Sequence, residues 1–109
     1  MTSVNDLIDR YFEASGRHDT EEVVRLFSPQ AVVVDDGKPY RGTALIRDWR
    51  NGAASEYKYT TKVTERVWSS ESEVLVTARL EGNFPGGTAD LHFSFEMAGS
   101  LISRLTIAP

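Results

Sequence analysis

Apolar residues in the first half of the chain recur mainly every three or four positions, which is the spacing of one helix face. This pattern predicts three helices, over residues 3–16, 20–28 and 43–51. Gly16 is expected to end the first helix as a C-terminal glycine, and Pro29 to stop the second. The third helix should turn Leu45, Ile46 and Trp49 inward.

A short apolar run, residues 31–34, predicts a buried strand between the second and third helices. The run ends at Asp35, and Asp36 and Gly37 follow it as a turn. A carboxylate at the exit of a buried strand can lie at the edge of the core, in or beside a pocket. Asp35 is therefore the first candidate for chemistry.

From residue 57 onward, apolar and polar residues alternate with period two, as they do in strands that bury one face. The predicted strands are residues 57–68, 73–82, 88–97 and 101–108. In the middle two strands one face is wholly apolar, and it consists of Val74, Val76, Ala78, Leu80, Ala89, Leu91, Phe93, Phe95 and Met97. In the last strand both faces carry apolar residues, so the pattern alone does not assign them.

Helices first and antiparallel strands afterwards predict an α+β fold. We expect one domain, residues 1–109, in which a curved, mostly antiparallel sheet forms a conical barrel on three N-terminal helices, a cystatin-like α+β cone. Such a cone leaves an apolar cavity between the sheet and the helices, which is a usual kind of small-molecule site. The expected ligand is a small apolar molecule.

The composition of the chain indicates which classes of partner and which cellular compartment to expect. The net charge of −4 provides no basic stripe for phosphates, so no nucleic-acid partner is expected. The chain has no cysteine, which excludes disulfides and thiolate metal sites, and we expect neither a metal nor a cofactor. Its apolar runs are too short for a membrane span, and Asp6 and Asp9 stand where a signal peptide would be positive. We therefore expect a cytoplasmic protein without a membrane partner.

Several short motifs match a known superfamily. They are Arg10-Tyr11, Asp19, Leu26-Phe27, residues 31–35, residues 41–44 with Ile46-Arg47, and His92-Phe93 with Phe95 and Gly99. On these residues the chain resembles the nuclear transport factor 2-like superfamily over essentially its whole length. Within that superfamily it is similar to the bacterial steroid Δ-isomerases and to SnoaL-like, polyketide-cyclase-like domains. The resemblance implies the cone fold; it implies the reaction less strongly, because the superfamily hosts several enzyme classes and non-catalytic domains.

The resemblance also implies roles for two residues. The isomerases carry a carboxylate general base at the end of the first strand, where this chain has Asp35, and an oxyanion-donating tyrosine on the first helix, matched by Tyr11. Their second oxyanion donor corresponds to Leu91, and their supporting tyrosine to Arg50. Losing one oxyanion donor costs roughly 10²–10³ in rate in other enzymes. Steroid isomerisation itself is therefore not expected, whereas proton transfer by a base and one donor is compatible with the sequence.

Each candidate has a structural alternative. Asp35 could bond to the backbone of the 36–37 turn, and Tyr11 could pack in the core with its hydroxyl satisfied. Five more residues are expected to bind substrate as cavity walls, with core packing as their alternative: Trp49, Tyr57, Tyr59, Leu91 and Phe93.

The sheet face away from the helices is expected to be polar and to form a homodimer interface. Its expected members are Arg66, Trp68, Thr77, Arg79, Glu81, His92 and Ser94. His92 has Asp90 as a possible partner on that face, and His18 is expected at the surface. For Arg104 two facings are open: the family resemblance implies the cavity, where it could bind an anionic ligand, whereas Leu101, Leu105 and Ile107 favour the outward facing.

Two functions remain open. The first is a cofactor-independent isomerase, cyclase or lyase, in which Asp35 moves a proton and Tyr11 stabilises the oxygen of an apolar carbonyl or hydroxyl substrate. The second is a non-catalytic ligand-binding or dimerisation module. The two differ in whether Tyr11 and Asp35 face the same void.

Overall fold

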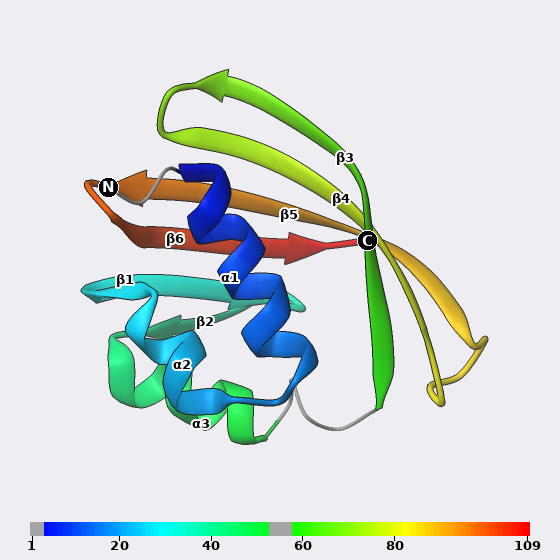
Figure 1. The fold of residues 1–109 in the computed structure, drawn as a ribbon. Helices are drawn as coiled ribbons and strands as arrows, with labels where there is room; N and C mark the ends of the chain where they lie inside the picture. Colours follow the sequence, from blue (N-terminus) through cyan, green and yellow to red (C-terminus); the bar gives the residue numbers. More distant parts are fainter. Residues whose placement is uncertain (1–3, 53–57) are drawn as a thin grey trace.

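A computed structural model describes residues 4–52 and 58–109, in which the helices precede most of the sheet (Figure 1). The helices are α1 (Val4–Gly16), α2 (Thr20–Arg25) and α3 (Thr43–Asn51). The strands are β1 (Phe27–Asp35), β2 (Lys38–Arg41), β3 (Tyr59–Ser70), β4 (Glu73–Gly82), β5 (Thr88–Ala98) and β6 (Leu101–Ala108). This is the predicted α+β order with β2 added. None of the helices in the described part combines the length and apolar character needed to cross a membrane.

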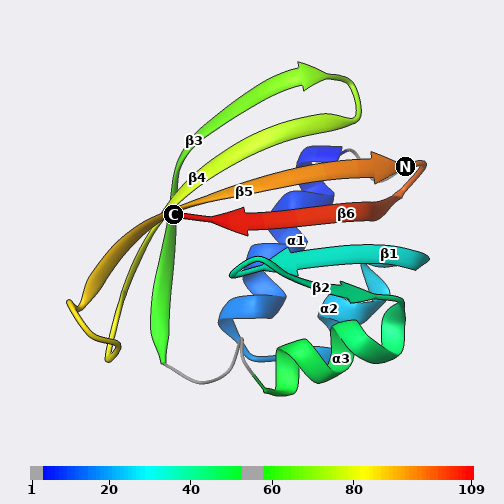
Figure 2. The same cartoon turned by 180° about the vertical axis from the view of Figure 1, so that it is seen from behind.

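The strands form one sheet in the order β2-β1-β6-β5-β4-β3. Paired strands are antiparallel except β1 and β6, which are parallel. Seen from either side, β3, β4 and β5 bend strongly, and α1 crosses the concave face of the sheet (Figure 1, Figure 2). The result is the predicted α+β cone, with a curved sheet that stays unclosed because β2 and β3 form its edges.

The connection between α1 and α2 differs from the prediction at one residue. Gly16 is the last residue of α1, and the backbone reverses at His18, which has a φ of 56°. Asp19 caps α2, with its carboxylate accepting a hydrogen bond from the Glu22 N–H at 3.2 Å. His18 is exposed, as expected.

The strand β1 is longer than predicted. It begins at Phe27 rather than at Ala31, so Pro29 lies inside a strand instead of ending a helix. The pairing of β1 with β6 shifts register between Phe27 and Val32. Proline lacks an N–H and is tolerated at such an irregularity, which is why the proline rule for helices misplaced this boundary.

A hairpin that the sequence analysis missed joins β1 to β2. Its two turn residues, Asp36 and Gly37, have φ values of 53° and 74°, as in a type I′ turn. The Asp-Gly dipeptide after a strand was the available signal. The hairpin places Asp35 opposite Lys38 on one side and Ile107 of β6 on the other, which fixes it at the end of β1.

An irregularity in β3 reverses the predicted facing of its second half. The register against β4 shifts between Val63 and Glu65, so Arg66 pairs with the buried Val76. The Arg66 guanidinium consequently bonds to Asp9 of α1, and Trp68, opposite Val74, also lies on the helix side. Neither residue belongs to the outer face, as had been expected.

The outer face instead contains apolar residues. Val67 and Leu75 lie opposite each other on β3 and β4 and are 50% and 40% exposed.

Leu45 of α3 is 47% exposed, although it had been expected to point inward. Ile46 and Trp49 define the inward face of α3, and consecutive helical residues point about 100° apart, so Leu45 falls outside it.

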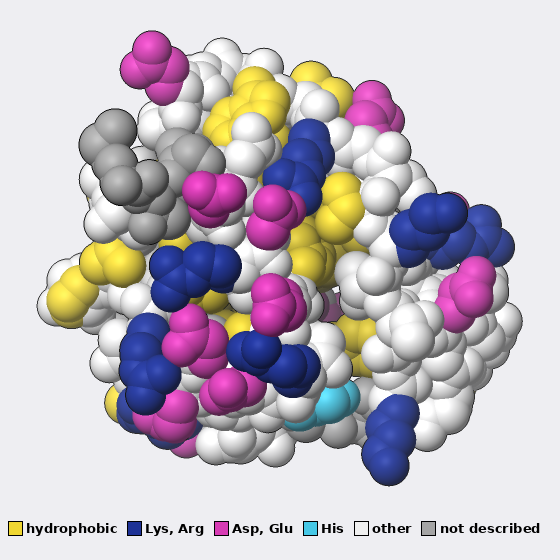
Figure 3. Space-filling view, viewed as in Figure 1, with side chains coloured by type: hydrophobic (Ala, Val, Ile, Leu, Met, Phe, Trp, Pro, Cys, Tyr) yellow, Lys and Arg dark blue, Asp and Glu magenta, His cyan; other side chains and the backbone are white. Residues whose placement is uncertain are grey.

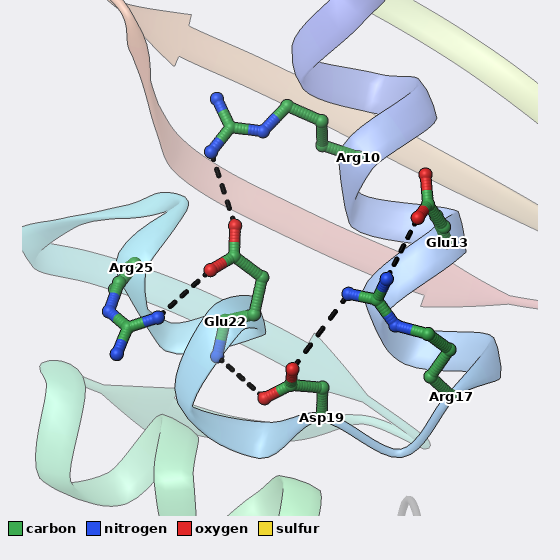
Figure 4. A network of polar contacts seen from close by, with 6 residues as sticks. All are labelled: Arg10, Glu13, Arg17, Asp19, Glu22 and Arg25. Carbon is green, nitrogen blue, oxygen red and sulfur yellow. Dashed lines mark hydrogen bonds and ion pairs between the residues drawn. The ribbon is translucent and has the colours of Figure 1, made fainter.

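Charged side chains of both signs intermingle on the face that carries the helices (Figure 3). Six of them form what we name the helix-surface network: Arg10, Glu13, Arg17, Asp19, Glu22 and Arg25 (Figure 4). At its centre, Glu22 accepts hydrogen bonds from Arg10 of α1 at 3.1 Å and from Arg25 at 2.9 Å. The network links α1 to α2 on the side that faces solvent.

Candidate functional site

A cavity of about 150 Å³ lies between the helices and the concave face of the sheet. Six of its lining residues carry polar groups: Tyr11, Ser15, Asp35, Arg50, Tyr59 and Thr61. The others are apolar or aromatic: Phe12, Trp49, Leu80, Leu91, Phe93 and Ile107. The cavity thus has an apolar body with a few convergent polar groups, as small-molecule sites do.

The predicted site residues come from distant parts of the sequence and line the same cavity. They are Tyr11 from α1, Asp35 from β1, Trp49 from α3, Tyr59 from β3, and Leu91 and Phe93 from β5. Tyr57 lies outside the described residues. Tyr11, Trp49 and Phe93 are buried, whereas Asp35, Tyr59 and Leu91 are only partly covered. Their contacts with a ligand remain predictions.

Asp35 is held by a hydrogen bond to another residue of the cavity lining. Its Oδ2 accepts from the indole Nε1–H of Trp49 at 2.9 Å. The Asp35 carboxylate is therefore bonded to α3. The turn-capping alternative would have required a bond to the backbone of the 36–37 turn instead. Because the indole is a donor only, it orients the carboxylate without being able to take its proton.

Tyr11 is a buried residue of the cavity lining whose ring is closely packed. The ring makes edge-on contacts with Phe12, Phe27 and Phe95, at centroid distances of 5.2, 6.2 and 5.3 Å. Burial raises the pKa of Tyr11 well above its ordinary value, and the positive charge of Arg50 opposes that rise. The phenol is therefore protonated at neutral pH and able to donate a hydrogen bond.

Arg50 is a cavity residue that the sequence analysis did not name as part of the site. Its side chain is 1% exposed, and its Nη2 donates a hydrogen bond to the main-chain carbonyl of Ser15 at 3.2 Å. The guanidinium carbon lies 5.4 Å from the ring centroid of Trp49. The available signal was spacing, since Arg50 follows Ile46 by one helical turn and shares its inward face.

Carboxylate, phenol and guanidinium thus occupy one cavity. The charges of Asp35 and Arg50 both act on the ionisation of the Tyr11 hydroxyl, with opposite signs. Chemically, the arrangement offers an acceptor for a proton and two donors for an oxygen that gains negative charge.

The other candidates lie on the outer face or at the surface. His92 uses its Nδ1 to contact the Thr77 hydroxyl at 3.1 Å, and Asp90 pairs in the ladder with Arg79. Of its two possible facings, Arg104 has the favoured, outward one, 3.7 Å from the carboxylate of Glu96. Within the described ranges, no group of three or more histidine and acidic side chains could hold a metal ion.

Residues 8–105 match the family model described as a SnoaL-like domain. A candidate polyketide cyclase from Sinorhizobium meliloti is similar to the chain at 32% sequence identity, with a TM-score of 0.87 and 94% of each chain covered. Among curated protein sequences, none matches this one.

Two enzymes are similar in structure at lower identity. Δ5-3-ketosteroid isomerase from a Mycobacterium species has 20% identity and a TM-score of 0.81, covering 100% of this chain and 94% of its own. The epoxide hydrolase/cyclase-like enzyme SalBIII, which acts in pyran-ring formation in salinomycin, has 18% identity and a TM-score of 0.80, covering 94% and 87%. At these identities the likeness shows a common fold.

Proposed function

The chain belongs to the SnoaL-like domain family, and on that premise we propose that it is a cofactor-independent isomerase, cyclase or lyase acting on a small carbonyl or hydroxyl compound. Asp35 is the general base, and Tyr11 is the donor to the oxygen of the substrate. One observation carries this proposal: a carboxylate and a buried phenol from distant segments line the same largely apolar cavity.

In the proposed reaction, Asp35 takes a proton from the carbon next to a carbonyl. The electron pair of the broken C–H bond forms a C=C bond, and the carbonyl oxygen gains negative charge. Tyr11 donates its hydrogen bond to that oxygen, which is stabilised most when its charge is greatest. Asp35 then returns the proton to another carbon, or the enolate closes a ring or expels a leaving group. The Trp49 indole keeps the carboxylate aimed at the cavity.

The size of the cavity favours a small substrate. A void of roughly 150 Å³ accommodates one benzene-sized ring in another protein, and the cavity here has about that volume. A fused multi-ring substrate would extend well beyond it. Leu91, at the position of the isomerases' second oxyanion donor, is a second argument against a steroid substrate.

Isomerisation of cyclohex-3-enone to its conjugated isomer, followed by ultraviolet absorbance, tests the proposal with a one-ring substrate. We expect Asp35→Asn to lower the enzyme-dependent rate by about 10²–10⁴-fold, the usual contribution of a general base. Asp36→Asn is the matched control: it makes the same chemical change at the adjacent, exposed turn residue, and asparagine tolerates the positive φ there. Equal rates for wild type and Asp35→Asn would refute the role of Asp35.

A second candidate function is a non-catalytic ligand-binding or dimerisation module. The exposed pair Val67 and Leu75, on a face otherwise of mixed polarity, favours it. We propose that this outer face forms the homodimer. Sedimentation over a wide range of dilution should then show a dimer that Leu75→Lys dissociates, and a monomer at every wild-type concentration would contradict the proposal.

A further inference from the structure

Arg50 brings a permanent positive charge into the cavity. Its guanidinium is almost fully buried and is positioned by the Ser15 carbonyl and the Trp49 ring. A guanidinium is a cationic group with hydrogen-bond donors and no acceptor. The cavity therefore always presents one cation to whatever enters it.

Arg50 and Tyr11 act on the same part of the cavity. The positive charge of Arg50 lowers the pKa of the Tyr11 hydroxyl against the effect of burial, and the Ser15 carbonyl, which accepts from Arg50, belongs to a residue of the same lining. Both groups can donate hydrogen bonds to a ligand oxygen. Donors of this kind bind an anionic oxygen more strongly than a neutral one, by forming charge-assisted hydrogen bonds.

Among the described residues of the lining, Asp35 is the one acidic side chain. Asp35 stands at the end of β1 and is bonded to the Trp49 indole. On the sheet side, the lining combines the apolar Leu80, Leu91, Phe93 and Ile107 with the hydroxyl-bearing Tyr59 and Thr61. A ligand that suits this distribution has an acidic end, an apolar ring, and a reactive carbon near Asp35.

We infer that the substrate is a compact oxo acid, about one ring in size, whose carboxylate is bound by Arg50. Tyr11 donates to the neighbouring carbonyl oxygen, and the carbon beyond that carbonyl faces Asp35. This substrate class rests on the proposed function, because it names the molecule on which the same three residues would act. It also assigns Arg50 the role of specificity-determining residue.

Benzoylformate and its amide form a suitable pair of probes, since they have the same ring and carbonyl but differ in charge. Neither has a hydrogen on the carbon beyond the carbonyl, so their binding is measured independently of proton transfer. By calorimetric titration we expect wild type to bind the acid at least about tenfold more tightly than the amide, as hydrogen bonds to a charged group require.

Three variants separate the charges that produce this preference. Arg50→Gln should reduce the ratio of the two affinities to near one, while Arg50→Lys should keep part of it because it keeps the charge. Asp35→Asn should tighten binding of the acid, because it removes a like charge from the cavity, and should leave the amide unchanged. A purely structural role of Arg50 would not produce the opposite signs of these effects.

Equal affinities of wild type for the acid and the amide, or no binding of either, would overturn the inference. So would a preference that survives Arg50→Gln. If Arg50→Gln does not fold, wild type and Asp35→Asn decide: tighter binding of the acid by the variant supports the inference, and unchanged binding overturns it. Failure of the proposed reaction would appear separately, as an unchanged turnover of cyclohex-3-enone by Asp35→Asn.

Discussion

The cavity and the helix-surface network hold the same kinds of charged group in opposite surroundings. In the network, Glu22 faces two guanidinium partners at the surface. In the cavity, Asp35 and Arg50 are held by neutral groups, an indole N–H and a main-chain carbonyl, beside aromatic rings. Water can replace a lost partner at the surface and does so poorly in the cavity. The charges at the surface are therefore expected to contribute less to stability than the buried groups of the cavity.

Trp49→Phe should have the largest effect on stability. It removes the indole N–H from Asp35 and leaves the carboxylate half-buried without that donor. We expect the free energy of unfolding to fall by about 1–2 kcal/mol, the lower part of the range for a buried acceptor that loses its partner.

Urea unfolding of Trp49→Phe and of Trp68→Phe makes the comparison direct. Trp68 is 37% exposed, so the control should stay within about 0.5 kcal/mol of wild type. Equal losses in the two variants would mean that the cavity bond contributes no more than a surface contact.

Tyr11→Phe should have an effect that depends on pH. Burial raises the pKa of Tyr11 above its ordinary value of 10.0, so the folded state keeps the phenolic proton when the unfolded state has lost it. The contribution of the buried, protonated phenol to the free energy of unfolding is therefore complete below a pH equal to the ordinary pKa, and it declines as the pH rises above that value. The stability difference between wild type and Tyr11→Phe should therefore shrink above about pH 10. Urea unfolding at neutral and alkaline pH measures this, and a constant difference would show that the hydroxyl is not shielded from water.

Arg10→Gln should have the smallest effect. The hydrogen bond from Arg10, followed by that from Arg25, lowers the pKa of Glu22. The resulting stabilisation is present above the ordinary pKa of glutamate and is lost as the pH falls. At neutral pH we expect a small fall in Tm, and on acidification a loss of stability that is smaller than that of wild type by the same small amount. A loss at neutral pH as large as that of Trp49→Phe would erase the distinction between the two regions.

Much of the fold was predictable because its signals are local. The α3 boundaries and the extents of β4 and β6 follow from apolar spacing within each segment, and the cap of α2 follows from Asp19. The positions of Tyr11 and Asp35 were also predictable, through family resemblance, and the structure brings both into one cavity lining.

The predictions of strand facing and helix ends were wrong where a single residue changes the structure that a sequence pattern indicates. The register shift near Val63 turned Arg66 and Trp68 to the helix side, because one extra residue reverses every later position in a strand. Pro29 was interpreted as a helix stop, although an irregular strand also tolerates proline. Neither outcome is encoded in the period-two or helical pattern itself.

The sequence by itself determined the three helices, five of the six strands, the carboxylate at the end of β1 and the tyrosine on α1, because these depend on neighbours within a few residues. Only the tertiary structure decided that Arg50 is buried beside Trp49, that Trp49 bonds to Asp35, and that about 150 Å³ remains open between them. The reason is physical: burial and cavity volume depend on which distant segments pack together, and an arginine near the end of a helix has the same local pattern whether solvent or a sheet lies opposite.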